Sequence, residues 1–292
     1  MYPCQPLSDE LLKKVQREAE AFTKKRGRPP QLTVVIVGDD PASKIYVGKK
    51  TEMCRKHGIA ANDVRLPVSS QSGLEKLIAQ FNADKSVDGI LVQSPLPKGF
   101  DANRIHTLIA PEKDVDCFNP INVGKLMIDA GFALTKGLVP CTPAGVMEVL
   151  RANKINLDGA DAVVLGRSTI VGKPMALMLL SANATVTMCH SRTRDLPAIC
   201  RTADVLVAAI GKAKFVTRDF IKPGAAVIDV GINRMLINGK SIVVGDVNAH
   251  DVDGVAGLLT PVPKGIGPMT IAMLIRNTVR AAYLREEGKS PI

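Results

Sequence analysis

The chain has 292 residues, of which 46% are hydrophobic, and this length allows two α/β domains with a sizeable core. Only 3% of the residues are aromatic and Trp is absent, so aliphatic side chains must fill that core. The six cysteines form no Cys-x-x-Cys pair, the N-terminus lacks a basic segment followed by an apolar one, and no apolar run could span a bilayer. These features argue against a secreted disulfide framework and a zinc site, and we expect a soluble, cytoplasmic protein without a metal centre.

The formal net charge of +10 raises the question of a nucleic-acid partner. The Lys and Arg residues are scattered, however, no nucleic-acid recognition motif is present, and aromatic residues on which bases could stack are scarce. A small polyanionic substrate together with a phosphorylated cofactor would use the same charge. We therefore expect small anions as ligands, with neither nucleic acid nor membrane among the partners.

In chain order, the beginning of the sequence alternates between helical and strand patterns. The expected elements are a helix at 8–26 capped by Ser8, a strand at 31–38, a helix at 43–57 ended by Gly58, a strand at 64–68, a helix at 73–83 and a strand at 88–93. The last strand leads into Ser94-Pro95-Leu96-Pro97, a rigid loop. Ligands bind at the carboxyl edge of open parallel sheets, so this loop is a candidate for ligand contact.

The second half of the chain begins with a loop-rich passage at 111–142 and a helix at 143–153 that Thr142 caps. Strands are then expected at 163–166, 185–189, 204–209, 226–230 and 241–244, and a last helix at about 268–286 packs back onto the first domain. This alternation predicts a Rossmann-like, doubly wound parallel sheet. The expected fold is α/β with two domains, residues 1–141 plus 271–292 and residues 142–270, and a cleft between them.

The stretch around Gly166 has the pattern of a strand, a tight turn and a helix. The apolar run 162–165 ends at Gly166, polar residues follow, and Gly172 and Pro174 open an apolar helical pattern. At such a turn the backbone N–H groups and the positive end of the helix dipole face one spot, which suits a phosphate. The glycine spacing is not Gly-x-Gly-x-x-Gly, so an ordinary strand-to-helix turn explains the motif alone equally well.

The next strand, 185–189, ends at His190-Ser191-Arg192. An NAD-binding unit carries a carboxylate about 20 residues beyond its glycine turn to accept the ribose hydroxyls. Here the strand end carries a hydroxyl and arginines, and Arg167 lies in the glycine turn itself, so a ribose phosphate could be held by charge-assisted hydrogen bonds. The pattern predicts NADP rather than NAD, unless these arginines only cover a solvated turn.

Four polar residues in the first domain make up three candidates for chemistry. Tyr46 and Lys50 are four residues apart and share a helix face, where burial or a nearby cation could lower the lysine pKa for acid/base work, although a solvated surface lysine is the commoner case. Asp116 could pair with the adjacent N–H donors of a pterin-like ring, or it could cap its loop. Gln93 follows a strand, either as a ligand contact or as a polar strand exit.

A fourth candidate is the stretch 260–270, in which two glycines stand among three prolines. Proline and glycine together preset a loop whose backbone can approach a flat ring closely. The same composition would also make a stiff turn before the last helix.

Taken together, these stretches closely resemble the bifunctional methylenetetrahydrofolate dehydrogenase/methenyltetrahydrofolate cyclohydrolase family. They occur in the family's order between about residues 33 and 271. The matching motifs are Ser43-x-x-Tyr46-Val47-x-x-Lys50, Asp88-Gly89-Ile90-Leu91-Val92-Gln93-x-Pro95-Leu96-Pro97, Pro111-x-Lys113-Asp114-Val115-Asp116, Pro140-Cys141-Thr142-Pro143, Gly166-Arg167-Ser168-x-x-Val171-Gly172-Lys173-Pro174, Asp229-Val230-Gly231 and Gly265-x-Gly267-Pro268-Met269-Thr270.

The resemblance implies an enzyme that oxidises 5,10-methylenetetrahydrofolate to 5,10-methenyltetrahydrofolate with NADP and then hydrolyses the product to 10-formyltetrahydrofolate. It implies a homodimer that binds folates in the cleft between the domains. The positive net charge of the chain would suit folates with polyglutamylated tails. By match of position, Lys50 would be the acid/base of the hydrolytic step, Tyr46 would orient the folate, Gln93 would hydrogen-bond to Lys50, and Asp116 would anchor the pterin.

The resemblance also implies two sets of binding residues. Folate would be bound by the four residues with proposed catalytic roles, Lys50, Tyr46, Gln93 and Asp116. Pro95, Gly267, Pro268 and Thr270 would complete its binding site. NADP would be bound by Gly166, Arg167, Ser168, Val171, Gly172, His190, Ser191, Arg192, Gly211, Gly231, Ile232 and Thr270, with Arg167, Ser191 and Arg192 holding the 2′-phosphate.

Three positions depart from the family pattern. Glu52 stands where a second lysine is common, and Cys117 and Lys264 each replace a glycine, so local charge and loop shape are expected to differ while both activities survive. Two other interpretations stay open. One is a shikimate-type dehydrogenase with a small hydroxy-acid substrate, which the Gln93 and Asp116 motifs do not fit, and the other is a basic nucleic-acid-binding module.

Overall fold

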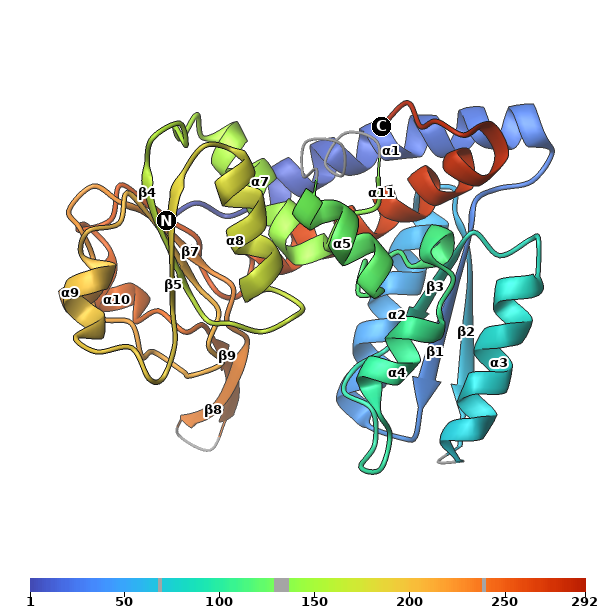
Figure 1. Ribbon diagram of the computed structural model, residues 1–292, viewed down its shortest axis with the longest axis horizontal. Coiled ribbons are helices and arrows are strands. Elements are labelled where there is room, and N and C mark those ends of the chain that lie inside the picture. Colours follow the sequence, from blue (N-terminus) through green and yellow to red (C-terminus); the bar gives the residue numbers. More distant parts are fainter. Residues whose placement is uncertain (68–69, 129–136, 238–239) are drawn as a thin grey trace. The chain divides into compact units, whose positions relative to one another are not determined.

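A computed structural model of the chain describes residues 1–67, 70–128, 137–237 and 240–292 (Figure 1). It divides into two compact units: unit 1 contains residues 1–9 and 142–270, and unit 2 contains residues 10–141 and 271–292. The structure defines each unit by itself, so the cleft expected between the domains stays a prediction.

The first nine residues pack with unit 1, whereas the sequence analysis placed them in the other domain. The backbone N–H of Tyr2 donates to Leu259 O at 2.7 Å, and that of Cys4 donates to Lys264 O at 2.9 Å. Helix α1 (Gln5–Arg26) begins three residues earlier than expected, since a proline near a helix start loses no hydrogen bond. Ser8 therefore lies inside the helix, buried, and donates to Pro268 O at 3.1 Å instead of capping it.

Unit 2 contains a three-stranded parallel sheet with the order β2-β1-β3. Its strands are β1 (Gln31–Val37), β2 (Ala60–Leu66) and β3 (Gly89–Val92). Strands β1 and β3 are buried almost throughout, as expected for a parallel sheet covered on both faces. Helices α3 (Gln71–Ala83) and α4 (Ala102–Leu108) pack on the face that carries Val35 and Ile90, and α2 (Pro41–Lys56) lies on the other side (Figure 1).

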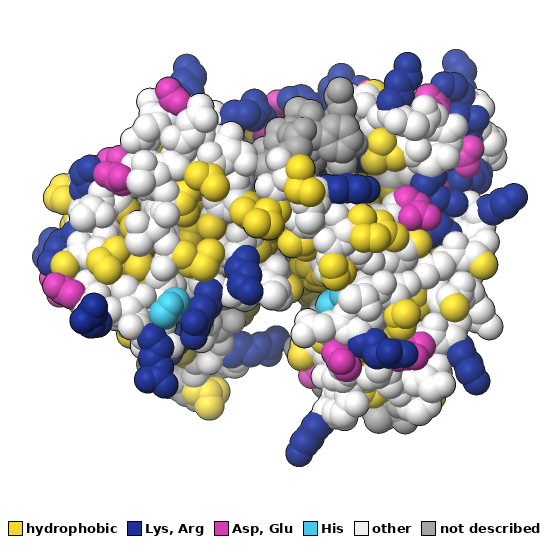
Figure 2. Space-filling view, viewed as in Figure 1, with side chains coloured by type: hydrophobic (Ala, Val, Ile, Leu, Met, Phe, Trp, Pro, Cys, Tyr) yellow, Lys and Arg dark blue, Asp and Glu magenta, His cyan; other side chains and the backbone are white. Residues whose placement is uncertain are grey.

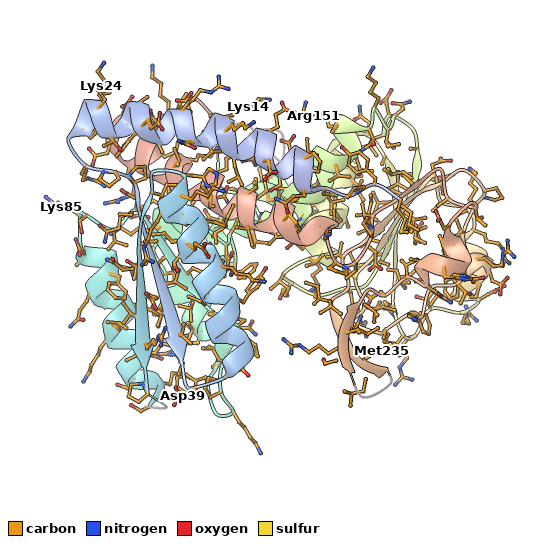
Figure 3. The ribbon with its side chains drawn as sticks, turned by 180° about the vertical axis from the view of Figure 1, so that it is seen from behind. Lys14, Lys24, Asp39, Lys85, Arg151 and Met235 are labelled. Atoms are coloured by element: carbon orange, nitrogen blue, oxygen red, sulfur yellow. The ribbon has the colours of Figure 1, made fainter. Side chains whose placement is uncertain are left out.

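Helices α1 and α11 (Ile266–Glu287) run side by side in unit 2. The Phe22 and Tyr283 rings meet edge to face at 5.1 Å, and Tyr283 Oη donates to Glu18 O at 3.1 Å. Lys14 and Lys24 project from the opposite side of α1 (Figure 3), so the helix has one packed and one solvated face.

Asp88, directly before β3, joins α11 to the sheet. Its fully buried carboxylate accepts hydrogen bonds from the guanidinium groups of Arg28 and Arg285, both at 2.7 Å, and from the N–H of Gln31 at 2.9 Å. Because a buried charge is costly unless it is paired and hydrogen-bonded, these donors are what permit the carboxylate there.

Unit 1 contains a five-stranded parallel sheet with the order β10-β7-β6-β4-β5, and Figure 1 shows α7 and α8 on one side of it and α9 and α10 on the other. The strands are β4 (Asp161–Leu165), β5 (Thr185–Cys189), β6 (Val205–Ala208), β7 (Ala226–Asp229) and β10 (Leu258–Leu259). The helices are α7 (Cys141–Ala152), α8 (Gly172–Ser181), α9 (Leu196–Cys200) and α10 (Ala249–Val252), and a short 3-10 helix, η2 (Arg218–Phe220), precedes β7. This is the doubly wound arrangement that the sequence predicts.

The strand expected at 241–244 does not belong to this sheet. It forms β9 (Lys240–Val244), which pairs antiparallel with β8 (Asn233–Ile237), and the two-residue β10 takes the place beside β7. An alternating pattern indicates a strand without naming its partner, and a nearby strand in the sequence pairs at the lowest loop-closure cost.

Outside residues 129–136, the passage expected to be rich in loops contains two helical segments that precede α7, η1 (Pro111–Lys113) and α5 (Pro120–Ile128). Asn119 Oδ1 accepts the N–H of Ile121 at 2.8 Å and so starts α5. Helix α7 begins at Cys141, which places Thr142 within its first turn and not at its cap. Thr142 Oγ1 instead lies 3.0 Å from Thr270 Oγ1.

Candidate functional site

In unit 2, Lys50 on α2 has a buried side chain with 7% exposure. Its Nζ donates to Gln93 Oε1 at 3.1 Å and lies 4.7 Å from the centre of the Tyr46 ring. Gln93 directly follows β3, and its Nε2 donates to Ser94 O, which turns the amide oxygen toward the lysine. The structure therefore brings Lys50, Tyr46 and Gln93 together, and Lys50 is not the solvated surface lysine that its spacing alone would favour. Pro95 lies exposed just beyond Gln93.

Asp116 acts on this group electrostatically. Burial raises the pKa of Tyr46, and the negative charge of Asp116 raises it further, so the phenol stays protonated at neutral pH. Asp116 itself is half-buried in the loop that follows η1. The neutral phenol of Tyr46 thus lies close enough to the Lys50 amine and the Asp116 carboxylate to interact with both.

Asp114 organises the loop that carries Asp116. Its buried carboxylate accepts from Asn119 N at 2.8 Å, Asn122 Nδ2 at 3.0 Å and Phe118 N at 3.2 Å. Burial raises the pKa of Asp114 to about 6, and these three hydrogen bonds act in the opposite direction. The loop-capping role that we considered for Asp116 is performed by Asp114.

The neighbouring Lys113 ties the same loop to α3. Its ammonium group is buried and donates to three backbone carbonyls, those of Phe81 at 2.8 Å, Asn82 at 2.9 Å and Asp84 at 2.6 Å. These carbonyls end a helix and have no partner within it, and a cation at a helix C-terminus also complements the helix dipole. Lys113 is therefore a structural cap.

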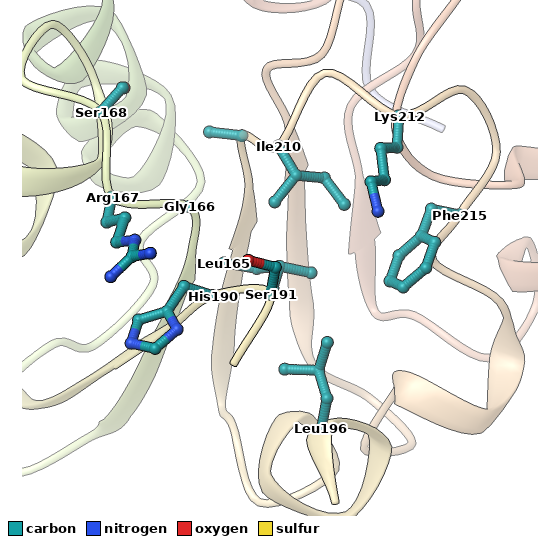
Figure 4. Close-up of a pocket in the computed structure, with 11 residues that line it drawn as sticks. Leu165, Gly166, Arg167, Ser168, His190, Ser191, Leu196, Ile210, Lys212 and Phe215 are labelled. Carbon is teal, nitrogen blue, oxygen red and sulfur yellow. The ribbon is translucent and has the colours of Figure 1, made fainter. Parts of the chain in front are cut away.

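Unit 1 contains a cavity of about 350 Å³ at the carboxyl ends of β4, β5 and β6 (Figure 4). The strand order reverses here, because β5 and β6 lie on opposite sides of β4, and ligands of doubly wound sheets bind at such a point. The cavity is lined by Leu165, Gly166, Arg167, Ser168, His190, Ser191, Leu196, Ala209, Ile210, Lys212 and Phe215.

The charge of this lining suits a phosphorylated nucleotide. Arg167 and Lys212 extend from different loops (Figure 4), and Lys212 Nζ lies 5.3 Å from the centre of the Phe215 ring. Among the described residues that line the cavity none is acidic, so the carboxylate that would bind an unphosphorylated ribose is missing from this lining. Elsewhere Lys and Arg side chains are spread in small groups over the visible face (Figure 2).

The cavity is lined by some of the residues that were expected to bind the cofactor. Gly166, Arg167, Ser168, His190 and Ser191 line it. The other expected residues, which do not line it, are Val171, Gly172, Arg192, Gly211, Gly231, Ile232 and Thr270.

Lys212 lines the cavity and Arg192 does not, so the expected contact of Arg192 with the cofactor stays a prediction. The exposed Arg192 lies on a turn in which its own N–H donates to His190 Nδ1 at 3.1 Å. The sequence analysis missed Lys212, although its place after a strand end and a glycine was an available signal.

The turn at Gly166 needs glycine for a steric reason. Its φ is 131°, and a Cβ there would lie 2.2 Å from Ala209 O. Ser168 Oγ accepts from Val171 N at 3.2 Å and Gly172 N at 3.3 Å. These N–H groups at the start of α8, which we expected to face a phosphate, are thus engaged by Ser168.

Gly267, Pro268 and Thr270 lie in unit 1, apart from the Lys50 group of unit 2 in the division of the chain. Their expected contact with folate stays a prediction. Cys117 and Lys264 have φ values of 61° and 77°, in the region that favours glycine, so both loops keep a glycine-like backbone with a larger residue. Glu52 is exposed on α2.

Within the described ranges, no group of three His, Cys, Asp or Glu side chains is arranged to hold a metal ion. None of the helices in the same ranges is both long and apolar enough to cross a membrane. All six cysteines are buried and unpaired.

A doubly wound parallel sheet with a cationic cavity at its switch point defines a dinucleotide-binding enzyme of the dehydrogenase type, here joined to an α/β unit that holds a buried amine. The NAD(P)-binding domain of tetrahydrofolate dehydrogenase/cyclohydrolase matches residues 140–286, and the catalytic domain of the same family matches residues 3–116. The chain belongs to this family, which confirms the resemblance seen in the sequence.

Individual relatives match almost the whole chain. A bifunctional protein FolD from Caldicellulosiruptor saccharolyticus is 50% identical over 280 residues, which cover 96% of this chain and 99% of that protein. The crystal structure of the FolD enzyme from Campylobacter jejuni superposes with a TM-score of 0.90 at 44% identity, over 96% of this chain and 97% of that one. The enzyme from Trypanosoma brucei, solved with NADP and an inhibitor, gives a TM-score of 0.93 at 35% identity, over 98% of both chains.

Proposed function

We propose that Lys50 and the side chains around it perform the hydrolytic half of a two-step folate conversion. The chain is a bifunctional enzyme that oxidises 5,10-methylenetetrahydrofolate to 5,10-methenyltetrahydrofolate with NADP and hydrolyses the product to 10-formyltetrahydrofolate. The observation that carries the residue assignment is the buried amine of Lys50, held by Gln93 Oε1 and packed on the Tyr46 ring.

The oxidation needs two rings held in contact with water excluded, and no acid or base from the protein. When bound, NADP supplies the hydride acceptor. In unit 1, Arg167, Ser191 and Lys212 would hold its 2′-phosphate, and Leu196 and Ile210 would give the nucleotide an apolar wall. The combination of cations, hydroxyls and apolar side chains in one cavity fits this group.

The hydrolysis needs proton movement. Water adds to the cationic methenyl carbon, one proton of the water reaches the departing ring nitrogen, and the other is released. The Lys50 amine, fixed by its hydrogen bond to Gln93, would hold and transfer a proton at Nζ.

Asp116 would anchor the pterin through the adjacent ring N–H groups, with Tyr46 and Gln93 orienting the ring and Gly267, Pro268 and Thr270 completing the folate site. The net charge of +10 supports a substrate with several carboxylates, such as a polyglutamylated folate.

We also propose a cytoplasmic homodimer. The β8–β9 hairpin exposes apolar side chains, with Leu236 at 79% and Val243 at 40% exposure, and such a surface suits a second copy of the chain. Six buried, unpaired thiols are consistent with a reducing compartment.

An absorbance assay with 5,10-methylenetetrahydrofolate tests both reactions and the choice of cofactor. NADP should support the formation of the methenyl product much better than NAD, and this product should then decay to the formyl compound faster than it does without enzyme. Methenyl formation without accelerated decay would refute the hydrolytic assignment, and equal rates with NAD would refute the phosphate-binding assignment.

A further inference from the structure

Asp246 follows β9 and is fully buried. Its Oδ2 accepts from Ile210 N at 2.6 Å and Gly211 N at 3.0 Å, and its Oδ1 accepts from Lys212 N at 2.8 Å and Asn233 Nδ2 at 2.9 Å. One carboxylate therefore accepts hydrogen bonds from three consecutive backbone N–H groups, those of the turn at residues 210–212. Charged acceptors form the stronger class of hydrogen bond, so this turn is held firmly.

A second buried carboxylate fixes Asp246 from behind. Asp229, at the end of β7, accepts from the N–H of Asp246 at 3.0 Å, from Gly231 N at 2.9 Å and from Val247 N at 2.9 Å. The backbone on which Asp246 stands is thus bound to the main sheet. Asp229 thus binds the backbone of Asp246, and the Asp246 carboxylate in turn binds the 210–212 turn.

Two glycines leave room for these carboxylates. A Cβ at Gly231 would lie 2.3 Å from Asp246 Cγ, and a Cβ at Gly245 would lie 1.8 Å from Asp229 Oδ2. We expected Gly231 to contact the cofactor, and the structure supplies a different reason for a glycine there. The close fit also means that a longer acid could not replace Asp246.

The turn that Asp246 holds forms one wall of the cavity. Ile210 and Lys212 line the cavity, and the adjoining Ala209 touches the Gly166 turn so closely that no side chain fits between them. A displacement of the 210–212 turn would therefore move the Ile210 side chain and the Lys212 cation within the cavity lining.

We propose that Asp246 is a positioning residue for cofactor binding, because its carboxylate holds the 210–212 turn in the conformation that shapes the nucleotide cavity. The N–H groups of this turn are then engaged inside the protein, so Lys212 serves the cofactor through its side chain. The inference rests on the assignment of the cavity to NADP.

The test replaces Asp246 with asparagine. In Asp246→Asn one acceptor oxygen becomes an NH₂ group facing backbone N–H donors, so the turn must rearrange. We expect the Kd for NADPH, measured by fluorescence titration, to rise at least tenfold, and kcat at saturating NADP to stay within threefold. The hydrolysis rate, measured on added methenyltetrahydrofolate without cofactor, should stay within twofold, since Lys50 lies in unit 2.

Asp251→Asn is the matched control. Asp251 lies in the same unit and also accepts a backbone N–H, that of Arg218 at 2.7 Å, but it does not line the cavity. This variant should bind NADPH as the wild type does. A Kd for Asp246→Asn within twofold of the wild type would overturn the inference, and so would an equal loss in the control.

Asn233→Ala is a milder second variant, which decides the matter if Asp246→Asn does not fold. It removes the fourth donor to Asp246 and should raise the Kd for NADPH two- to fivefold with an unchanged circular dichroism spectrum, and an unchanged Kd would contradict the proposal. Arg167→Gln separates the premise from the inference. If this change leaves NADPH binding intact, the cavity assignment fails and the inference fails with it.

Discussion

The Lys50 group of unit 2 and the nucleotide cavity of unit 1 both lie by the carboxyl ends of parallel strands, but they are assembled differently. In unit 2, the candidate side chains contact one another directly, as in the hydrogen bond from Lys50 to Gln93. In unit 1, the side chains that line the cavity come from several turns, and the 210–212 turn takes its shape from Asp246, 35 residues from Gly211. The first site should therefore fail through loss of one side chain, whereas the second should also fail through loss of loop geometry.

The largest expected effect is on the side-chain site. Lys50→Met removes the proposed proton-transfer group and should lower the rate of methenyl hydrolysis by a factor of about 100 or more, a typical size for loss of a general acid or base. NADPH binding should be unchanged. Lys49→Met, a change at the exposed neighbouring lysine, is the control and should hydrolyse normally. Hydrolysis by Lys50→Met at nearly the wild-type rate would remove Lys50 from the mechanism.

Lys113 tests how the Asp116 loop is supported. Lys113→Met removes the ammonium donor of three backbone carbonyls and should lower the free energy of unfolding by about 3 kcal/mol, measured by urea titration with circular dichroism. Lys85→Met, at a lysine that projects outward (Figure 3), should change it by no more than about 0.5 kcal/mol. Similar losses in the two variants would mean that the three hydrogen bonds do not stabilise the loop.

Asp114 provides a prediction about pH. Its pKa is raised from 3.8 to about 6, so between these values the folded protein keeps a proton that the unfolded chain releases. The contribution of Asp114 to stability is therefore fully present below pH 3.8 and is lost as the pH rises through 6. At about 1.36 kcal/mol per pKa unit, the free energy of unfolding of the wild type, relative to Asp114→Asn, should fall by up to about 3 kcal/mol from pH 4 to pH 7. A difference between the two proteins that stays constant with pH would contradict this.

Arg167 and Arg192 test the cavity itself. Arg167→Gln should raise the Kd for NADPH about tenfold or more and that for NADH less than threefold, because the guanidinium group is expected to pair with the 2′-phosphate. Arg192→Gln should change both constants less than threefold, since Arg192 does not line the cavity. The reverse order of effects would contradict the assignment of the 2′-phosphate to Arg167 and would place it at Arg192.

The smallest expected effect is an increase in stability. Lys264 has a φ of 77°, which costs a side chain about 1–2 kcal/mol, so Lys264→Gly should raise the free energy of unfolding by about 0.5–1 kcal/mol after the added chain entropy. Lys98→Gly, at an exposed lysine without a positive φ, should lower it slightly. Thermal unfolding of both variants against the wild type is the measurement, and destabilisation by Lys264→Gly would disprove the strain.

The contrast between the sites also explains what could be predicted from the sequence. Lys50 and Gln93 could be found because a helix face and a strand end are local patterns, and Gly166 because a strand, a turn and a helix follow one another directly. Asp246 could not be found this way, since its partners are turn N–H groups far away in the chain, and nothing in its neighbours indicates them. The antiparallel pairing of β9 with β8 could not be predicted for the same reason, because a strand pattern does not specify the partner strand.

The six cysteines give the chain a set of built-in reporters. Burial raises the pKa of the Cys54 and Cys200 thiols to about 12 and that of Cys4 to about 11, so a maleimide or a similar electrophile should find almost no thiolate in the intact fold. Labelling would then require local opening. Since Cys54 belongs to unit 2 and Cys200 to unit 1, mass spectrometry of labelled peptides would time the opening of each half of the molecule separately, without any engineered probe.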